Sequence, residues 1–312
     1  MSSVAIVFPG QGSQHLNMLS QGAILDIASS SEYSHLVELC SDLVSLDFID
    51  LLENGPEDSL NKTSITQPIL LLTSFFHYQN LINQTSVDPV ILAGHSLGEY
   101  SALIAANSLG IEDGLKLVRK RGLLMEEAPS GSMAAILGLD FLSIEEICAQ
   151  VSIDQSMQVQ CANLNSPSQT VISGMIEAVA KAQELCLEAG AKRAITLKVS
   201  IASHSPLMKS VQEEYHAFLS TIELKVPEVS VLHNVNNSIS AMPGEIKNLL
   251  VQQLYSPVQW ANICKEISAL CLPTIECGPG KVLGGLFKAN GVNDYFSTAD
   301  SNFYEKILTH VK

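Results

Sequence analysis

The sequence has little positive charge. Lys and Arg number 17 against 32 Asp and Glu, for a formal net charge of −15 at pH 7. Only three arginines occur, Arg119, Arg121 and Arg193, and the first two lie close together. A surface that binds nucleic acid needs clustered Lys and Arg. The composition therefore excludes a nucleic-acid-binding protein.

Paired cysteines and long apolar runs are also missing. The seven cysteines include no Cys-x-x-Cys pair and no histidine at metal-ligand spacing, so we expect reduced thiols in a cytoplasm and no metal site. No apolar run approaches the ~18 residues of a membrane span, and the first residues lack the basic segment of a signal peptide. We therefore expect no membrane contact.

The most informative stretch is 88–100, Asp-Pro-Val-Ile-Leu-Ala-Gly-His-Ser-Leu-Gly-Glu-Tyr. Its apolar run up to Gly94 predicts a strand buried on both faces, and the apolar spacing over 97–108 predicts a helix. The Gly-x-Ser-x-Gly pattern between them is typical of a nucleophile elbow, which lifts the Ser96 hydroxyl clear of a sheet. Side chains at the flanking glycines would collide in so tight a turn. The N–H of Leu97, at the helix start, would point at an oxyanion.

The order of elements predicts an α/β protein with an inserted subdomain. A length of 312 residues suggests about two domains. Residues 131–199 have the order β-α-β-β-α-β, which is the ferredoxin-like order and closes its own sheet. We therefore expect a small subdomain at 131–199 and a large one formed by residues 1–130 and 200–312.

Local patterns give more detailed expectations. Residues 22–53 are expected to be helical, and a helix is expected over 69–83 with Pro68 at its first position, where a missing N–H costs nothing. Ser143 is expected to cap a helix, and residues 163–168 are expected to form a turn.

A serine nucleophile needs a base within hydrogen-bond reach. Two of the eight histidines follow predicted strands closely: His204, in a loop stiffened by Pro206, and His233. An α/β-hydrolase also carries an acid between the serine and the histidine, and no Asp or Glu lies in a convincing strand-end loop there. We expect a neutral acceptor to orient the histidine, and the pattern leaves both histidines open.

Six motifs occur in a fixed order along the chain. They are Phe8-Pro-Gly-Gln-Gly-Ser-Gln14, Gly94-His-Ser-Leu-Gly-Glu-Tyr100, Arg121-Gly-x-x-Met125, Ala162-Asn-Leu-Asn-Ser-Pro167, Ser203-His204 and Glu276-x-Gly-Pro-Gly-Lys281. Together they resemble the malonyl-CoA:acyl carrier protein transacylases of bacterial fatty-acid synthesis over residues 4–290. The resemblance implies an α/β-hydrolase-like core with a parallel sheet, interrupted by a ferredoxin-like subdomain.

The resemblance also implies roles for single residues. Ser96 would be the acylated nucleophile and His204 its base. The N–H groups of Gln11 and Leu97 would form the oxyanion hole. Gln253 falls where the family orients the histidine through a backbone carbonyl, which fits the missing acid.

The substrate implied is malonyl-CoA, with Arg121 and Gln11 in its binding site. A guanidinium offers a planar fork that matches a carboxylate, which lysine cannot copy. The malonyl group would pass through an ester on Ser96 to the phosphopantetheine thiol of acyl carrier protein, in a ping-pong mechanism with no further cofactor. Arg119, by contrast, is expected to be an ordinary helix-surface residue.

Two positions depart from the family pattern, and other functions stay open. The linker 126–132 is short, and Ser168 stands where glycine is usual; both concern the subdomain junction. The alternatives are a serine thioesterase or esterase, a polyketide-type acyltransferase that takes methylmalonyl-CoA, and a carrier-binding module without activity.

The expected partner, an acyl carrier protein, is commonly acidic. A chain with a net charge of −15 would then need a local basic patch near the cleft. One candidate patch combines Lys116, Arg119 and Lys120 with Lys281 and Lys288; the other consists of Lys181, Lys192 and Arg193. We expect a monomer.

Overall fold

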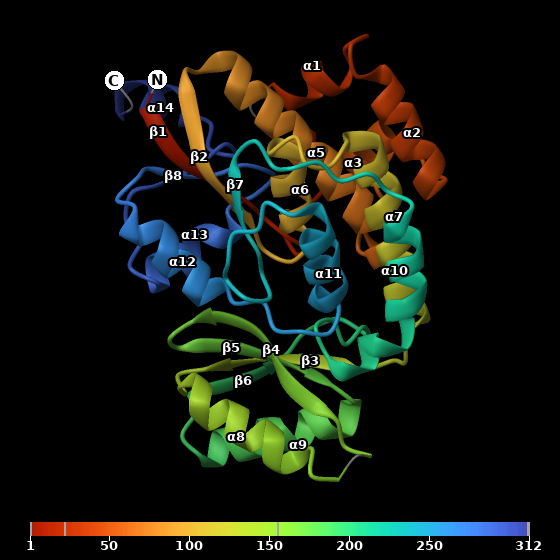
Figure 1. Ribbon diagram of the computed structural model, residues 1–312, viewed down its shortest axis with the longest axis vertical. Coiled ribbons are helices and arrows are strands. Elements are labelled where there is room, and N and C mark those ends of the chain that lie inside the picture. The colour runs from red at the N-terminus through yellow and green to blue at the C-terminus, as the bar shows by residue number, and fades with distance from the viewer. Residues whose placement is uncertain (1, 22, 155, 311–312) are drawn as a thin grey trace.

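The computed structural model describes residues 2–21, 23–154 and 156–310. Figure 1 shows a larger part that holds both chain ends and a smaller part at the opposite end of the long axis. Residues from the middle of the chain form the smaller part. The α/β class predicted from the order of elements is confirmed.

The larger part is built on a five-stranded parallel sheet with the order β7-β2-β1-β8-β9. Its strands are β1 (Ser2–Phe8), β2 (Val87–Gly94), β7 (Ser230–Leu232), β8 (Thr274–Glu276) and β9 (Tyr295–Ser297). Alternate residues of β1 face two different apolar cores, Val4 and Ile6 one core and Ala5 the other. The strand is thus buried on both faces, as is usual in a parallel sheet whose connections cross over it.

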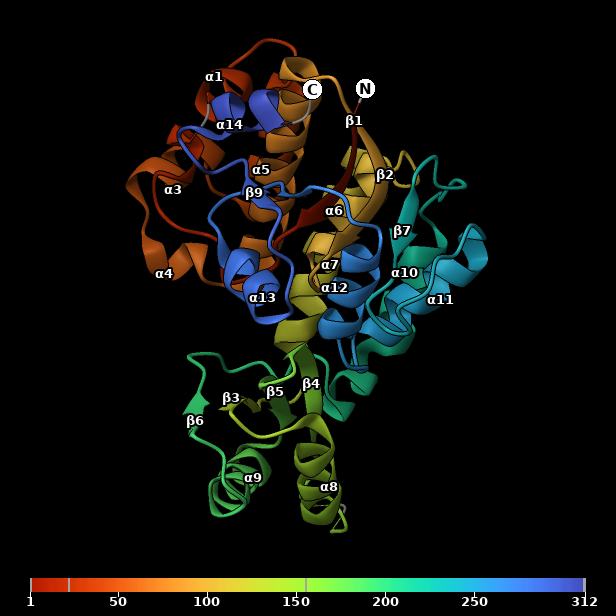
Figure 2. The ribbon, with the colours of Figure 1, turned by 90° about the vertical axis from the view of Figure 1, so that its left-hand side faces the viewer.

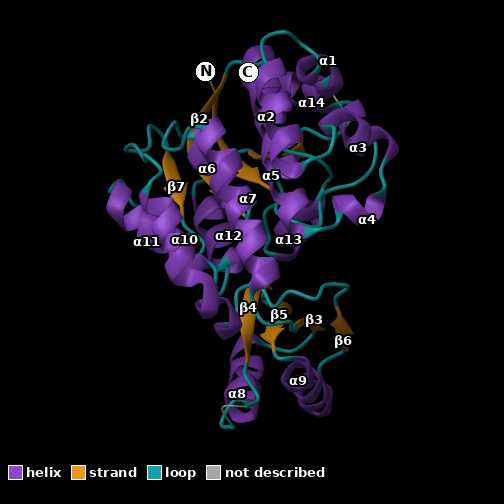
Figure 3. Cartoon of the chain, turned by 90° about the vertical axis from the view of Figure 1, so that its right-hand side faces the viewer, coloured by secondary structure: helices purple, strands orange, loops and turns teal. Residues whose placement is uncertain are grey.

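Helices cover both faces of this sheet (Figure 3). They are α1 (Ile24–Ala28), α2 (Ser34–Val44), α3 (Phe48–Asn54), α4 (Glu57–Leu60), α5 (Thr63–Gln84), α6 (Gly98–Ala105), α7 (Ile111–Glu127), α10 (Gln212–Ser220), α11 (Pro243–Gln253), α12 (Trp260–Ala269), α13 (Val282–Ala289) and α14 (Phe303–His310), with 3₁₀ turns η1 (Met18–Ser20) and η2 (Pro206–Val211). Among these helices, α5 and α6 pack on the face of Val4 and Ile6, and α12 and α13 pack on the other. None of the described helices combines the length and apolar character that a bilayer crossing requires.

The smaller part has a four-stranded antiparallel sheet with the order β4-β5-β3-β6. Its elements are β3 (Ser132–Leu137), α8 (Phe141–Val151), β4 (Val159–Ser166), β5 (Gln169–Gly174), α9 (Ile176–Glu188) and β6 (Arg193–Thr196). Figure 2 shows α8 and α9 on the face of the sheet that points away from the larger part. The two segments that connect the smaller part to the larger one lie side by side, since the Gly131 N–H donates to the Ser200 carbonyl over 3.0 Å.

The range 22–53, expected to be helical, holds the three separate helices α1, α2 and α3, and residue 22 lies outside the described residues. Ser45 ends α2 in the left-handed region with φ 58°. Asp47 then caps α3 by accepting a 2.7 Å hydrogen bond from the Asp50 N–H. Because a capped start follows a left-handed stop, α2 and α3 are separate helices.

Pro68 does not begin its helix; it lies inside α5, which starts at Thr63. A proline at that position leaves the carbonyl four residues earlier without its helical partner. That carbonyl belongs to Ser64, and the Arg119 Nη1 donates to it over 2.7 Å. The side chain from α7 thus replaces the missing hydrogen bond, and Arg119 is not the plain surface residue that we expected.

Two expectations for the smaller part also need correction. Asp140, not Ser143, caps α8, because the Asp140 carboxylate accepts from the Ser143 N–H over 3.0 Å. The turn expected over 163–168 is shorter, since β4 continues to Ser166 through register shifts in its pairing with β5. Ser168, where the family has glycine, is not among the residues with positive φ, so the backbone there does not require glycine.

Candidate active site

The elbow predicted from Gly-x-Ser-x-Gly joins β2 to α6. Ser96 lies at its apex with φ 52°, in the left-handed region. A Cβ on Gly94 would lie 1.9 Å from the Gly98 carbonyl carbon, and a Cβ on Gly98 would lie 2.1 Å from the Phe8 carbonyl oxygen. No side chain fits at either distance, so this turn needs glycine at both flanks.

The Ser96 hydroxyl lies against His204. Ser96 Oγ is 2.8 Å from His204 Nε2, and His204 Nδ1 is 2.7 Å from the Gln253 backbone carbonyl. Because a carbonyl only accepts, Nδ1 carries the hydrogen, and Nε2 is free to accept the serine proton. This is the arrangement that a general base needs, with a neutral acceptor in the place of an acid.

His204 is held in its neutral form. Its side chain is buried, and burial, together with the nearby positive charge of Arg121, lowers the pKa of His204 to about 3. The hydrogen bond to the Gln253 carbonyl acts in the opposite direction but is the weaker cause. An uncharged imidazole with an open lone pair can take a proton near neutral pH.

Arg121 extends from α7 to the same place. Its guanidinium donates from Nη1 to Gln67 Oε1 and from Nη2 to Gln253 Oε1, each over 3.0 Å, and Nη2 lies 3.4 Å from Ser96 Oγ. The side chain is only 2% exposed, and it has no ion pair with a carboxylate of the described residues. Its Nε has no partner there. A buried cation with neutral partners can accept an incoming carboxylate.

The proposed oxyanion donors lie on two segments that touch. A Cβ on Gly10, next to Gln11, would lie 2.3 Å from the His95 carbonyl oxygen, so the loop after β1 is pressed against the elbow. Within the described residues the N–H groups of Gln11 and Leu97 donate to no protein acceptor. The Gln11 side chain is held by Thr63 Oγ1 over 3.0 Å.

The structure separates the two candidate bases. His233 is buried with Nδ1 2.7 Å from Glu99 Oε1, and it makes no contact with the Ser96 hydroxyl. His95 turns away from the serine as well; its Nε2 lies 2.9 Å from Asn165 Oδ1. Of the histidines that we considered, His204 alone is hydrogen-bonded to Ser96 in the described part of the chain.

Sequence reasoning missed two residues of the larger part that build the site, Asn234 and Glu99. Asn234 accepts from the Ser96 N–H and donates to the Gly94 carbonyl, both over 2.7 Å, and so clamps the elbow. Glu99 is completely buried behind it. The signal for Glu99 was present as an acid in an apolar helix, whereas Asn234 gave no signal beyond its place at a strand end.

The smaller part also reaches the site. Gln160, on β4, donates through Nε2 to the His204 carbonyl over 2.7 Å and to the Tyr255 carbonyl over 2.8 Å. These two hydrogen bonds hold the loop of His204 from the side of the smaller part.

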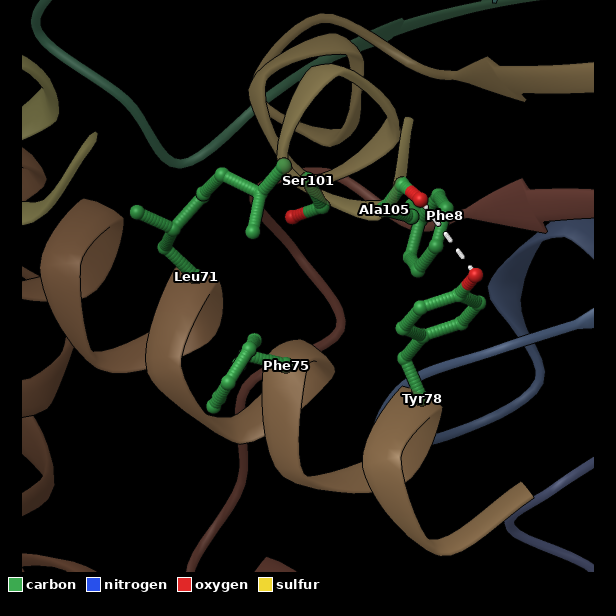
Figure 4. A pocket seen from close by; sticks show the side chains of 7 residues that line it. Phe8, Leu71, Phe75, Tyr78, Ser101 and Ala105 are labelled. Atoms are coloured by element: carbon green, nitrogen blue, oxygen red, sulfur yellow. Dashed lines mark hydrogen bonds between the residues drawn. The ribbon is translucent and has the colours of Figure 1, made fainter. Parts of the chain in front are cut away.

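Two other features do not belong to this site. A cavity of about 10 Å³ between α5 and α6, lined by Phe8, Tyr78 and Ser101 among others, has room for about one water, and its lining includes neither Ser96 nor His204 nor Arg121 (Figure 4). The described residues also contain no group of three or more His, Cys, Asp or Glu side chains placed to hold a metal ion.

Comparisons with known proteins identify the family of this chain. Residues 5–277 match the acyl transferase domain family. The chain is 43% identical to a malonyl CoA-acyl carrier protein transacylase of Haemophilus influenzae, with 99% of this chain and 100% of that protein covered. It is 41% identical to the Escherichia coli protein of the same name, with 92% and 93% covered.

Solved structures are similar over the whole chain. The malonyl-CoA:acyl carrier protein transacylase of Xanthomonas oryzae has a TM-score of 0.92 at 37% identity, with 100% of this chain and 99% of that chain covered. A malonyl-transacylase solved in complex with a type II polyketide acyl-carrier protein has a TM-score of 0.90 at 38% identity, with 99% and 100% covered. The chain belongs to the acyl transferase family, among the malonyl CoA-acyl carrier protein transacylases.

Proposed function

We propose that this chain transfers the malonyl group from coenzyme A to the phosphopantetheine thiol of an acyl carrier protein through a malonyl ester of Ser96. The observation that carries the proposal is the buried Arg121, without a carboxylate partner in the described residues, 3.4 Å from the Ser96 hydroxyl. A serine esterase has no need of such a cation beside its nucleophile. An enzyme whose substrate carries a free carboxylate on its acyl group needs a cation to bind that carboxylate.

The chemistry follows from the hydrogen bonds. His204 Nε2 takes the Ser96 proton as Oγ attacks the thioester carbon, and the same proton passes to the departing coenzyme A sulfur. The oxyanion is held by the N–H groups of Gln11 and Leu97, and each such donor contributes about 10²–10³ in rate. The carrier thiol then gives its proton to Nε2, attacks the Ser96 ester, and leaves as the malonyl thioester while Oγ recovers the proton.

Arg121 would favour transfer over hydrolysis. Its fork would bind the malonyl carboxylate and hold the acyl chain over the ester, which leaves little room for water until the carrier thiol arrives. Rapid hydrolysis of the ester would instead favour the thioesterase alternative.

The relatives' names support acyl carrier protein as the partner, and one similar structure is such a complex. Most lysines of both candidate docking patches already have acidic partners: Lys116 with Asp113, Lys120 with Glu214, Lys281 with Asp300 and Lys181 with Glu184. Lys192, Arg193 and Lys288 have no ion pair within the described residues. They are the better candidates for contact with an acidic carrier, and raised salt should then increase the KM for the carrier.

The proposal also covers the fold type, the domain boundaries, the oligomeric state and the location of the protein. The parallel sheet with its elbow supports an α/β-hydrolase-like core, and the four-stranded sheet with two helices on one face supports a ferredoxin-like subdomain, with boundaries at 1–130, 131–199 and 200–312. One chain holds all the proposed site residues, so the proposed site would be complete in a monomer, and the transfer steps above involve no further cofactor. Unpaired cysteines support a cytoplasmic location.

The test is incubation with malonyl-, methylmalonyl- or acetyl-CoA, followed by mass mapping of the acylated residue. We expect a stable malonyl adduct on Ser96, its absence in Ser96→Ala, and its discharge by a phosphopantetheinylated carrier. An adduct that forms as readily with methylmalonyl-CoA would favour the polyketide-type alternative. Failure to form any adduct would leave only a carrier-binding module.

A further inference from the structure

Glu99 is a buried carboxylate in contact with the groups that hold the proposed site. It lies in the first turn of α6, three residues after Ser96, and is completely buried. Its Oε1 lies 2.7 Å from His233 Nδ1. Its Oε2 accepts from Gln253 Nε2 over 2.6 Å and from the Asn234 N–H over 3.2 Å. With the His233 hydrogen on Nδ1, three donors converge on the two oxygens, a set that suits a carboxylate.

These contacts determine which way the Gln253 amide faces. Its Nε2 donates to Glu99 and also to the Ser96 carbonyl over 3.0 Å. Both amide hydrogens are therefore used on this side, and Oε1 must point to the other side, where it accepts from Arg121 Nη2. A reversed amide would place its N–H groups against the guanidinium and leave Glu99 facing an oxygen. Glu99 thus fixes the orientation of the acceptor that holds Arg121.

The charge of Glu99 matters together with its hydrogen bonds. A buried guanidinium is costly unless a negative charge lies near it. A carboxylate in direct contact with Arg121 would occupy the N–H groups that a substrate carboxylate needs. The Gln253 side-chain amide lies between Glu99 and Arg121. The charge of Glu99 therefore offsets the burial of the Arg121 guanidinium and leaves its N–H groups available for a substrate carboxylate.

We propose that Glu99 is a positioning residue that selects for carboxylated acyl groups, because through the Gln253 side chain it holds the Arg121 guanidinium ready for the malonyl carboxylate. The inference rests on the proposed function and adds a determinant of specificity to it. Glu99 touches neither the acyl group nor the reacting atoms in this arrangement. Its effect should therefore appear in the choice of substrate rather than in the chemical step.

The experiment compares kcat and KM for malonyl-CoA and acetyl-CoA in Glu99→Met and Gln253→Met. Methionine is close in size to both residues and removes only the polar contacts, while the Gln253 backbone carbonyl still orients His204. We expect each variant to lower the malonyl-to-acetyl ratio of kcat/KM by about tenfold, the effect of one hydrogen bond to a charged group, mainly through KM for malonyl-CoA. The double variant should lose no more than the single ones, since both act along one path.

Glu276→Met is the matched control. Glu276 is also a completely buried carboxylate, held by Tyr295 and the Leu283 N–H, but it has no contact with Arg121 or Gln253. Its substitution should lower stability and leave the substrate ratio unchanged. If Glu99→Met does not fold, Glu99→Asp keeps the charge but is one methylene short of Gln253, and the ratio should then fall by about threefold.

An unchanged ratio in Glu99→Asp or a folded Glu99→Met would overturn the inference, as would equal losses for both substrates. Failure of the proposed function looks different. In that case the unmodified protein itself forms no malonyl ester on Ser96, whatever the variants do.

Discussion

The interiors of the two parts differ in kind. Around Ser96 the larger part buries charged and polar side chains that contact one another, namely Glu99, Arg121, His204, His233, Asn234 and Gln253. The core of the smaller part is apolar, with residues such as Ile136, Ile144 and Ile172. No Asp, Glu, Lys or Arg is buried among its described residues, 131–154 and 156–199.

The difference indicates that the two parts have different roles in stability and in the proposed site. Apolar burial is the main source of stability and tolerates changes of shape, whereas a buried polar network needs every partner in place. Toward its neighbour the smaller part presents Gln160 and Asn165, which contact the His204 carbonyl and the His95 ring. It therefore forms a wall of the proposed site, whose proposed reacting groups lie in the larger part.

The sharpest way to break this comparison is to remove the charge at the centre of the polar network. Arg121→Ala should lower kcat/KM for malonyl-CoA by about 10²–10⁴, the effect of losing one partner of a buried charge pair. The ratio of acetyl to malonyl transfer should rise at the same time, because the uncharged acetyl group has no carboxylate for Arg121 to bind. Steady-state transfer to a carrier, with each thioester in turn, measures both.

The outcome that contradicts this prediction is specific. A preserved malonyl-to-acetyl ratio, with both activities reduced, would mean that Arg121 supports the fold of the site and does not bind the substrate.

The complementary change removes apolar volume from the smaller part. Ile172 is completely buried in that core, so Ile172→Ala should lower the free energy of unfolding by about 2–5 kcal/mol. The acylation rate of Ser96 should change by less than about threefold at temperatures where the protein is folded, since no reacting group moves. Denaturant unfolding and burst-phase acylation test the two halves of this prediction.

Leu142 supplies the control on α8. Its side chain is 66% exposed, so Leu142→Ala should stay within about 0.5 kcal/mol of the unchanged protein. If Ile172→Ala slowed acylation as strongly as it lowered stability, the two parts would be one energetic unit.

Local sterics made much of this molecule predictable from its sequence. The elbow follows in part from a turn in which a Cβ on Gly94 would collide with Gly98, and this constraint lies within five residues. The need for glycine at Gly98 comes instead from Phe8 on β1. The strand predicted to run up to Gly94 is β2, which ends at that residue, because the tight glycine turn follows it directly.

What could not be predicted depends on contacts between distant segments. Nothing local to His204 or His233 says which of them reaches Ser96; the answer depends on the loop that Gln160 and Leu254 hold in place. Pro68 was expected to start a helix because its rescue by Arg119 comes from another helix. In both cases the deciding hydrogen bond spans many residues, and no window of sequence contains it.

The smallest expected effect, and the last way to separate the two parts, is their response to acid. Burial lowers the pKa of His77 and of His204 to about 3 each, and it also lowers the pKa of His95. All three lie in the larger part, and residues 131–199 contain no histidine. Since the unfolded pKa is about 6.5, the unfolded chain binds more protons between that pH and about 3. The stability from each histidine is complete above pH 6.5 and is lost as the pH falls through this window.

Glu276 opposes this trend, because burial raises its pKa to about 7. Its contribution is present below its unfolded pKa and is lost as the pH rises through 7, so it offsets one of the three histidines.

His77→Gln isolates a single histidine. It should flatten the dependence of unfolding free energy on pH by up to about 1.4 kcal/mol per pH unit between pH 6 and 4. His216→Gln, at an exposed position on α10, should leave the slope as it is. Hydrogen exchange at pH 5 and 7, corrected for intrinsic rates, should show protection falling in α5 and β2 and persisting in β3 and β5. An equal fall in both parts would mean that the polar interior of the larger part does not control its sensitivity to acid.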